Sequence, residues 1–244
     1  MELRERVALV TGGASGIGAA TVSLLRAMGS RVASVDLQPS GDADLSIQAD
    51  VGDEAQMAEA MQHVQAELGL LKLAVLNAGV GSFSPIRSMS VEEWDRVHRI
   101  NLRGALIGLR ECAEAMTDGG AVVAVTSISA FTAERGTAAY STSKAALTQL
   151  VRVAARELGP NNITVNAVAP GTTDTPLFLS TDQLPGYQER AAARTPLGRL
   201  GRAIDIAAAI VSLLSLDWVT GQVLVADGGL SLYSPIDPME AFEQ

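Results

Sequence analysis

Seven short runs rich in β-branched residues alternate along the chain with longer segments of helical period. Several of these runs are apolar at successive positions, as in a parallel sheet that helices cover on both faces. Right-handed crossovers between parallel strands then give a doubly wound sheet. The predicted strands are residues 6–11, 31–36, 45–50, 71–76, 121–126, 163–168 and 222–227.

The alternation continues along the chain without a linker, a charge block or a repeat. We therefore predict one Rossmann-type α/β domain over residues 1–244, with seven mainly parallel strands and helices on both faces. Residues 171–201, rich in Gly, Pro and Thr, and the tail 232–244 depart from the alternation. Long loops in compact domains are usually functional lids or mobile arms, and we expect the first segment to be a substrate lid.

Charge and cysteine content exclude several classes of partner. The formal net charge is -9 and no basic run occurs, which argues against nucleic acid or an anionic membrane as a partner. The longest late apolar stretch, residues 206–216, is too short to span a bilayer. Cys112 is the single cysteine and cannot form an internal disulfide. These features predict a cytoplasmic protein, and we expect no metal site.

A glycine-rich turn, TGGASGIG at residues 11–18, follows the first predicted strand and leads into a helical segment. Glycines at such a turn let backbone N–H groups approach a pyrophosphate at the positive end of the helix dipole. A tight turn without a ligand is the alternative interpretation. The predicted cofactor-binding residues in this turn are Gly12, Ser15, Gly16, Ile17 and Gly18.

Asp36 closes the second predicted strand, near the offset at which an acidic residue meets the adenosine ribose. A carboxylate there repels a 2'-phosphate, so NAD is favoured over NADP. Asp50 and Val51 follow the third predicted strand, where Asp50 could border the adenine or cap a helix. Another turn after a strand predicts cofactor contacts from Asn77, Ala78 and Gly79.

Tyr140 and Lys144 stand four positions apart in YSTSKAAL, so on a helix they share one face. An ammonium near the phenol favours phenolate and lowers the phenol pKa from about 10 towards neutrality, which makes a general acid/base. A surface Tyr–Lys contact without function is the alternative. Ser127 follows the fifth predicted strand and would emerge at the same rim of the sheet as the glycine-rich turn.

Together these motifs make the chain resemble the short-chain dehydrogenase/reductase family, in its compact single-domain branch, from residue 6 to about residue 230. The glycine-rich turn matches the family's TGxxxGxG, and Ser127 precedes Tyr140 of YxxxK by the family's thirteen residues (140 − 127). Asn101, in RINLRGA, stands where the family has its fourth catalytic residue. The family's NNAG is LNAG here, with Leu76 in place of the first Asn.

The resemblance implies roles for these residues. Tyr140 would exchange a proton with the substrate oxygen while hydride passes between carbon and nicotinamide, and Ser127 would orient the substrate. Lys144 would hold the cofactor ribose and, together with the cationic nicotinamide, depress the phenol pKa, and Asn101 would help to hold a water that relays protons. The family's PG motif adds predicted contacts to the nicotinamide carboxamide from Pro170, Gly171, Thr173 and Thr175.

The predicted function is hydride transfer between NAD and a secondary alcohol or ketone, with alcohol oxidation favoured. An NADP-dependent carbonyl reductase and a non-catalytic dinucleotide-binding sensor are the alternatives. The largely apolar lid suggests an alicyclic, aromatic or lipid-like substrate, whereas Arg135, Arg190 or Arg194 could instead bind a carboxylate. The resemblance also implies a homotetramer that packs residues 101–116, residues 140–158 and the C-terminal region between subunits.

Overall fold

A seven-stranded sheet forms the centre of the computed structural model, which describes residues 2–179 and 186–232. The strand order is β3-β2-β1-β4-β5-β6-β9 and every neighbouring pair is parallel. This arrangement confirms the predicted doubly wound α/β fold. The strands are β1 (Val7–Thr11), β2 (Arg31–Asp36), β3 (Leu45–Gln48), β4 (Leu71–Leu76), β5 (Gly120–Val125), β6 (Ile163–Pro170) and β9 (Val223–Ala226).

The direction of winding reverses between β1 and β4. From β1 the chain runs outwards to β2 and β3, and then returns to build β4, β5, β6 and β9 on the other side of β1. In open α/β sheets, ligands bind in the crevice at the carboxyl ends of the strands beside such a reversal. The topology therefore places a candidate site where β1 and β4 end.

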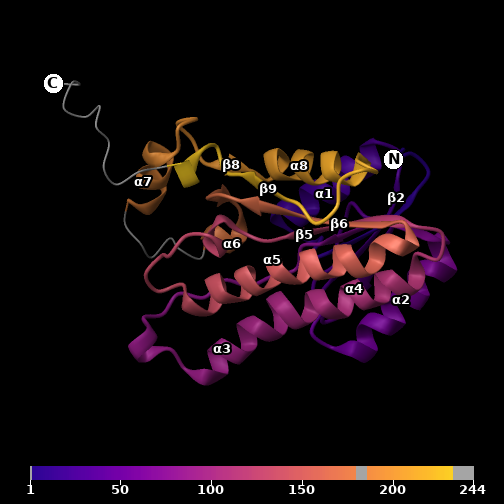
Figure 1. The fold of residues 1–244 in the computed structure, drawn as a ribbon, viewed down its shortest axis with the longest axis horizontal. Helices are drawn as coiled ribbons and strands as arrows, with labels where there is room; N and C mark the ends of the chain where they lie inside the picture. Colours follow the sequence, from indigo (N-terminus) through magenta and orange to yellow (C-terminus); the bar gives the residue numbers. More distant parts are fainter. Residues whose placement is uncertain (1, 180–185, 233–244) are drawn as a thin grey trace.

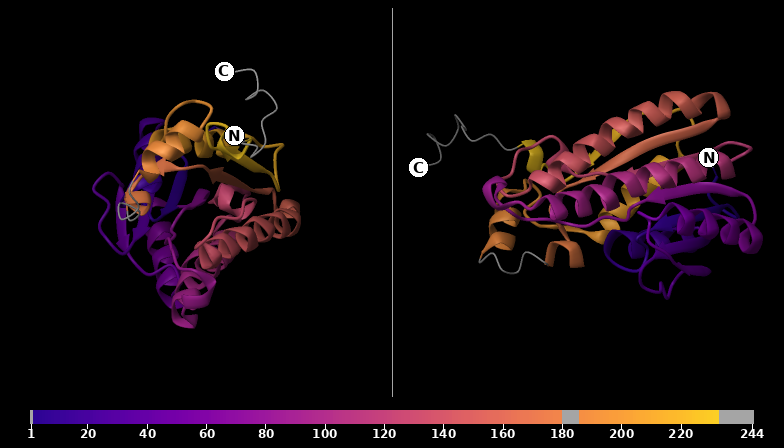
Figure 2. Two further views of the ribbon diagram at one scale, coloured as in Figure 1. Left: turned by 90° about the vertical axis from the view of Figure 1, so that its left-hand side faces the viewer. Right: turned by 90° about the horizontal axis from the view of Figure 1, so that it is seen from below.

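Helices cover both faces of the sheet (Figure 1). Helices α1 and α8 pack together on one face, whereas α2, α4 and α5 cover the other (Figure 2). The bounds of the helices are α1 (Gly16–Ala27), α2 (Glu54–Leu68), α3 (Val91–His98), α4 (Gly104–Ala115), α5 (Ala138–Leu158), α6 (Pro176–Leu179), α7 (Tyr187–Arg194) and α8 (Ala203–Ser215). Short helical segments are η1 (Ile86–Ser88), η2 (Arg99–Arg103, a π-helix), η3 (Ile128–Ala130), η4 (Gly159–Asn161) and η5 (Leu230–Leu232).

The core lies in two apolar layers, one on each face of the sheet. Alternate residues of β1 enter opposite layers: Val7 and Leu9 pack on the side of α2, α4 and α5, and Ala8 and Val10 on the side of α1 and α8. All four are at most 2% exposed, and burying a side chain the size of Val or Leu contributes about 1.5–3 kcal/mol. Burial on both faces explains why this strand lacks polar alternation.

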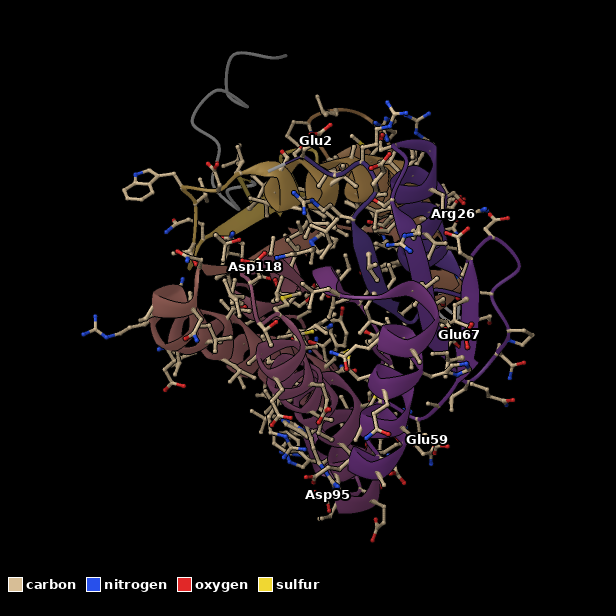
Figure 3. The ribbon with its side chains drawn as sticks, turned by 90° about the vertical axis from the view of Figure 1, so that its right-hand side faces the viewer. Glu2, Arg26, Glu59, Glu67, Asp95 and Asp118 are labelled. Carbon is tan, nitrogen blue, oxygen red and sulfur yellow. The ribbon has the colours of Figure 1, made fainter. Side chains whose placement is uncertain are left out.

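The two ends of the sheet carry different groups: a structural ion pair at one end, and the helices near the candidate site at the other. Figure 3 views the molecule from the end of the sheet where the strands begin. The residues labelled there include four that lie shortly before a strand: Glu2, Arg26, Glu67 and Asp118. There the buried Lys72 of β4 forms an ion pair of 2.8 Å with Asp118, a structural contact. The strands end on the opposite side, where α5 begins and α6 and α7 lie (Figure 1).

Some predicted boundaries were wrong in detail. The third strand ends at Gln48 rather than residue 50, because the Asp50 side chain accepts the Gly52 N–H at 2.8 Å and turns the chain. Residues 171–201 contain α6, α7, the short strand β7 (Thr173–Asp174) and the start of the short strand β8 (Gly201–Arg202), and the two strands pair in parallel. Residues 180–185 of that segment, and the predicted tail beyond Leu232, lie outside the described residues.

Within residues 2–179 and 186–232, no helix combines the length and the apolar character that crossing a bilayer requires.

Candidate active site

The glycine-rich turn leads directly into α1 at the carboxyl end of β1. Ser15 is the N-cap residue but makes no side-chain capping bond, and the first turn of α1 contains no acidic residue. Among the described residues, the backbone N–H groups that a helix leaves unpaired at its start therefore have no side-chain acceptor here. Together with the positive end of the helix dipole, they suit a phosphate group.

Close packing explains the glycines of this turn. Gly12 and Gly16 have positive φ angles of 69° and 55°, which side chains rarely adopt. A Cβ atom on Gly18 would overlap the Gly12 carbonyl oxygen, and one on Gly16 would lie 3.3 Å from Thr175 Cβ. Ile17 packs against the core. Because the glycine positions carry no side chains, the backbone N–H groups of the turn stay accessible to a pyrophosphate. Residues 11–18 therefore fit a dinucleotide.

Asp36 lies beside this turn, at the end of β2. Its Oδ2 accepts the Ala14 N–H and its Oδ1 accepts the Gln38 N–H, both at 3.0 Å. These bonds fix the carboxylate between the turn and the edge of the sheet, with its remaining lone pairs available to the hydroxyl groups of a ribose.

Asp50 and Val51 lie after β3, where the sequence left two interpretations of Asp50. The N-cap of α2 is Asp53, whose side chain accepts the Gln56 N–H at 3.1 Å, so capping by Asp50 was wrong. Asp50 instead pairs with Arg99 at 2.9 Å. Val51 is 7% exposed and packs in the core.

Residues 77–79 connect the end of β4 to the glycine-rich turn. Asn77 Nδ2 donates to the Gly12 carbonyl at 2.9 Å, and Thr11 Oγ1 accepts the N–H groups of Asn77 and Ala78 at 3.1 and 3.2 Å. A Cβ on Gly79 would stand 3.4 Å from Lys144 Nζ. The sequence interpretation did not assign this bridging role to Thr11, although the residue opens the TGGASGIG motif.

Leu76, which replaces the first Asn of the family's motif, is 4% exposed. A Cβ on Gly108 of α4 would lie 2.7 Å from its Cδ2. The substitution therefore places an apolar side chain against a helix in the core and leaves the contacts of Asn77 intact.

Ser127, Tyr140 and Lys144 meet at the carboxyl end of β5. Ser127 follows the strand, and its side chain is near enough to the phenol of Tyr140 to act on the phenol pKa, which it lowers. Lys144 Nζ lies 5.7 Å from the centre of the Tyr140 ring and donates to the Val125 carbonyl at 2.8 Å. The structure therefore brings together the three residues that the sequence selected from distant motifs.

Asn101 lies in the π-helical segment η2 between α3 and α4, rather than in one uninterrupted helix. Its Oδ1 accepts the Val80 N–H at 2.8 Å, and its Nδ2 donates to the Val80 carbonyl at 3.0 Å and to Ser143 Oγ at 3.1 Å. Wide turns of this kind occur frequently at functional sites. Ser143, next to Lys144 in the sequence, thus connects Asn101 to α5, a role that the sequence interpretation did not foresee.

Burial changes the acid–base properties of the central pair. Burial raises the pKa of Tyr140, although the nearby Ser127 side chain acts in the opposite direction. Burial lowers the pKa of Lys144 to about 8. The expected depression of the phenol pKa by Lys144 is therefore not a property of the ligand-free protein, because desolvation opposes both charged forms.

The segment that follows β6 reaches the glycine-rich turn. Pro170 ends the strand, and the Gly171 N–H donates to the Ala226 carbonyl at 3.1 Å. Thr173 Oγ1 donates to the Gly171 carbonyl at 3.0 Å, and Thr175 is the residue that lies beside Gly16. Of these residues, Thr175 lies against the glycine-rich turn, whereas Pro170, Gly171 and Thr173 belong to the segment at the carboxyl end of β6.

Comparisons with known proteins identify similar dehydrogenases and reductases. A family described as Enoyl-(Acyl carrier protein) reductase matches residues 12–231. A cis-4-hydroxycyclohexanecarboxylate dehydrogenase from Sinomonas cyclohexanicum is 40% identical, covering 92% of this chain and 96% of its own. Versicolorin reductase 1 from Aspergillus parasiticus is 36% identical, covering 92% and 95%. The ligand-free aldohexose dehydrogenase of Thermoplasma acidophilum superposes with a TM-score of 0.92 at 31% identity, covering 96% of this chain and 97% of its own.

Proposed function

The chain belongs to the short-chain dehydrogenase/reductase family, whose members are oxidoreductases that use a nicotinamide dinucleotide, and from that premise we propose that it transfers hydride between NAD and a secondary alcohol or its ketone. One observation carries the proposal: the Tyr140 phenol lies beside both Ser127 and Lys144, at the rim that also contains the uncapped start of α1.

Each residue of the site has a separate role in the proposed reaction. The cofactor supplies the hydride acceptor when bound. Tyr140 takes the hydroxyl proton of the alcohol as the carbon–hydrogen bond breaks, while Ser127 donates a hydrogen bond that holds the same oxygen. Lys144 is close enough to stabilise the phenolate, and Asn101 anchors the residues around it through Val80 and Ser143. Oxidation of the alcohol is the expected direction.

The choice of NAD is supported by Asp36. Its carboxylate is held at the end of β2 by the Ala14 and Gln38 N–H groups, so a 2'-phosphate would be brought against a fixed negative charge. The residues beside it in the sequence, Leu37 and Gln38, carry no positive charge that could offset this repulsion.

We predict that replacing Asp36 with Ala narrows the preference for NAD over NADP. Reduced nicotinamide is followed by absorbance with each cofactor and a panel of secondary alcohols and cyclic diols. The loss of a charged hydrogen-bond acceptor is expected to raise KM for NAD about tenfold, while KM for NADP stays level or falls. Glu59→Ala, which removes an exposed acidic side chain on α2, is the matched control. An Asp36→Ala variant with both KM values unchanged would favour the NADP-dependent alternative.

Two surfaces support a further proposal, that the protein is a homotetramer. Trp218 is 96% exposed and precedes the edge strand β9, which within the described residues pairs with β6 alone and exposes Leu224 and Val225, each at 41%. On another face, Leu106 of α4 is 53% exposed and lines a groove with Ala146 of α5. Exposed apolar patches of this kind mark interfaces.

We predict that light scattering gives four times the 25.3 kDa mass of one chain. Replacing Trp218 with Glu would place a charge in the proposed interface along β9, so we expect this variant to have a lower mass and the same far-ultraviolet circular dichroism. A wild-type mass of 25.3 kDa would contradict the tetramer.

A further inference from the structure

Arg96 of α3 and Asn101 of η2 hold consecutive residues of the loop that follows β4. Asn101 bonds to both the N–H and the carbonyl of Val80, at 2.8 and 3.0 Å. Arg96 Nη2 donates to the carbonyl of the next residue, Gly81, at 3.3 Å. The backbone of this loop is therefore held by side chains at two adjacent residues.

Residues 79–81, here called the 79–81 strip, run from Lys144 to helix α6. A Cβ on Gly79 would lie 3.4 Å from Lys144 Nζ. At the other end of the strip, a Cβ on Gly81 would lie 3.4 Å from Leu177 Cδ1 of α6. The 79–81 strip therefore borders the site between the proposed catalytic residues and the predicted lid.

Glu93 directs the Arg96 guanidinium towards the strip. Arg96 Nε and Nη2 donate to the two carboxylate oxygens of Glu93 at 2.7 and 2.8 Å, which makes a two-point ion pair along α3. The hydrogen bond from Arg96 lowers the pKa of Glu93 to about 2, so the ion pair persists at any pH at which activity would be measured. A guanidinium held at two points is planar and fixed, and its Nη2 also reaches Gly81.

We propose that Arg96 is a positioning residue for the substrate: it holds the 79–81 strip in the place where the strip forms the wall of the substrate pocket that faces α6. The reacting alcohol packs against this wall. The cofactor instead contacts the earlier Asn77, whose side chain bonds to the glycine-rich turn rather than to α3. This proposal rests on the proposed function and names a residue that sets substrate binding in the same site.

The first test is Arg96→Met, which removes the bond to the Gly81 carbonyl and keeps an apolar side-chain stem. We expect KM for the alcohol that the wild type oxidises fastest to rise about tenfold, because a hydrogen bond from a charged donor is lost. Both kcat and KM for NAD should stay within about twofold of wild type, because only substrate binding is weakened. Arg96→Lys, which keeps the charge, should raise KM for the alcohol less than Arg96→Met does.

Hydrogen–deuterium exchange gives a readout that needs no substrate. The N–H groups of Val80 and Ser84 are hydrogen-bonded in the stretch that contains the 79–81 strip. Arg96→Met should speed amide exchange of residues 79–84 about tenfold, because loss of a restraint lets the loop open locally. The unfolding temperature should change little, because the rest of the fold does not depend on this contact.

Arg26→Met is the matched control. Arg26, labelled in Figure 3, also pairs with a carboxylate, at 2.9 Å, and also donates to a backbone carbonyl, at 2.8 Å. The side chains of Arg26 and Arg96 are 45% and 42% exposed. Because Arg26 lies at the end of the sheet where the strands begin, its loss should leave both KM values and the exchange of residues 79–84 unchanged.

A second variant separates this role from assembly. Arg96 also lines the groove that contains Leu106, so its replacement could act through the proposed tetramer. Glu93→Gln weakens the ion pair while the arginine stays in the groove, and it should raise KM for the alcohol about threefold. Light scattering should give the same mass for Glu93→Gln and wild type.

Three outcomes overturn the proposal while leaving the proposed function intact. The first is an Arg96→Met enzyme with the wild-type KM for the alcohol, and the second is one in which KM for NAD rises equally. The third is a Glu93→Gln enzyme whose KM for the alcohol does not change. Absence of turnover by the wild type with every alcohol and both cofactors would instead overturn the proposed function, whereas unchanged exchange of residues 79–84 in Arg96→Met would by itself exclude the role of Arg96.

Discussion

Replacing Tyr140 with Phe is expected to reduce kcat for alcohol oxidation by about a thousandfold or more. The substitution removes the group that accepts the substrate proton, and positioned general acid/base groups typically contribute 10²–10⁴-fold. The aromatic ring stays, so its contacts with Lys144 and the surrounding backbone are kept. Initial rates measured by reduced-nicotinamide absorbance give the effect.

The pH profile gives a second readout for Tyr140. Because burial raises the phenol pKa in the ligand-free protein, the base form becomes more abundant as pH rises, and kcat/KM for oxidation should increase from neutral into alkaline pH. Tyr140→Phe should flatten this rise. The increase in unfolding temperature on adding NAD serves as the control and should persist in the variant. A Tyr140→Phe enzyme that retains a tenth of the wild-type rate would exclude the proposed role.

Replacing Lys144 with Met is expected to abolish turnover and at the same time to stabilise the ligand-free protein at pH 7. Lys144 is 4% exposed, and burial lowers its pKa from 10.5 to about 8. Folding therefore disfavours the ammonium form. At neutral pH this lowers the free energy of unfolding by up to about 3 kcal/mol. Loss of the hydrogen bond to the Val125 carbonyl offsets about 1 kcal/mol of the gain.

The pH dependence of the stability difference between the wild type and Lys144→Met tests whether the buried ammonium is its cause. The unfolded chain binds the lysine proton up to about pH 10.5, whereas the folded chain releases it near pH 8. Wild-type stability should thus rise relative to the variant between these pH values, and the difference in unfolding temperature should shrink across this window. Lys72→Met, which breaks the ion pair with Asp118, is the control and should destabilise the protein. A Lys144→Met protein that is less stable than wild type at pH 7 would contradict this explanation.

The effects expected of these two variants follow from how the site is built into the fold. Tyr140 and Lys144 occupy the first turns of a 21-residue helix, α5, that packs along β6. The helix and sheet supply the rigidity, so a desolvated lysine can be held beside a phenol without unfolding the domain. Residues that a site holds against their preferred solvation are commonly less favourable for stability than apolar replacements.

Much of the fold and site could be predicted from the sequence by itself, because the deciding signals are local. Apolar runs buried on both faces indicate parallel strands, and the glycines of residues 11–18 mark a turn that only a small residue permits. Four-residue spacing on a helix places Tyr140 and Lys144 on one face whatever surrounds them. These signals predicted the parallel arrangement of the strands, the glycine-rich turn and the residues that meet at its rim.

Only the tertiary structure decided the properties that depend on desolvation and on partners distant in sequence. Burial, which no local pattern reports, raises the pKa of Tyr140 and lowers that of Lys144, against the sequence expectation for the phenol. Asp50 pairs with Arg99, which lies 49 positions away in the sequence. The N-cap of α2 is Asp53 instead. Electrostatic free energies depend on distance and solvent exclusion in three dimensions, and the sequence specifies both only through the completed fold.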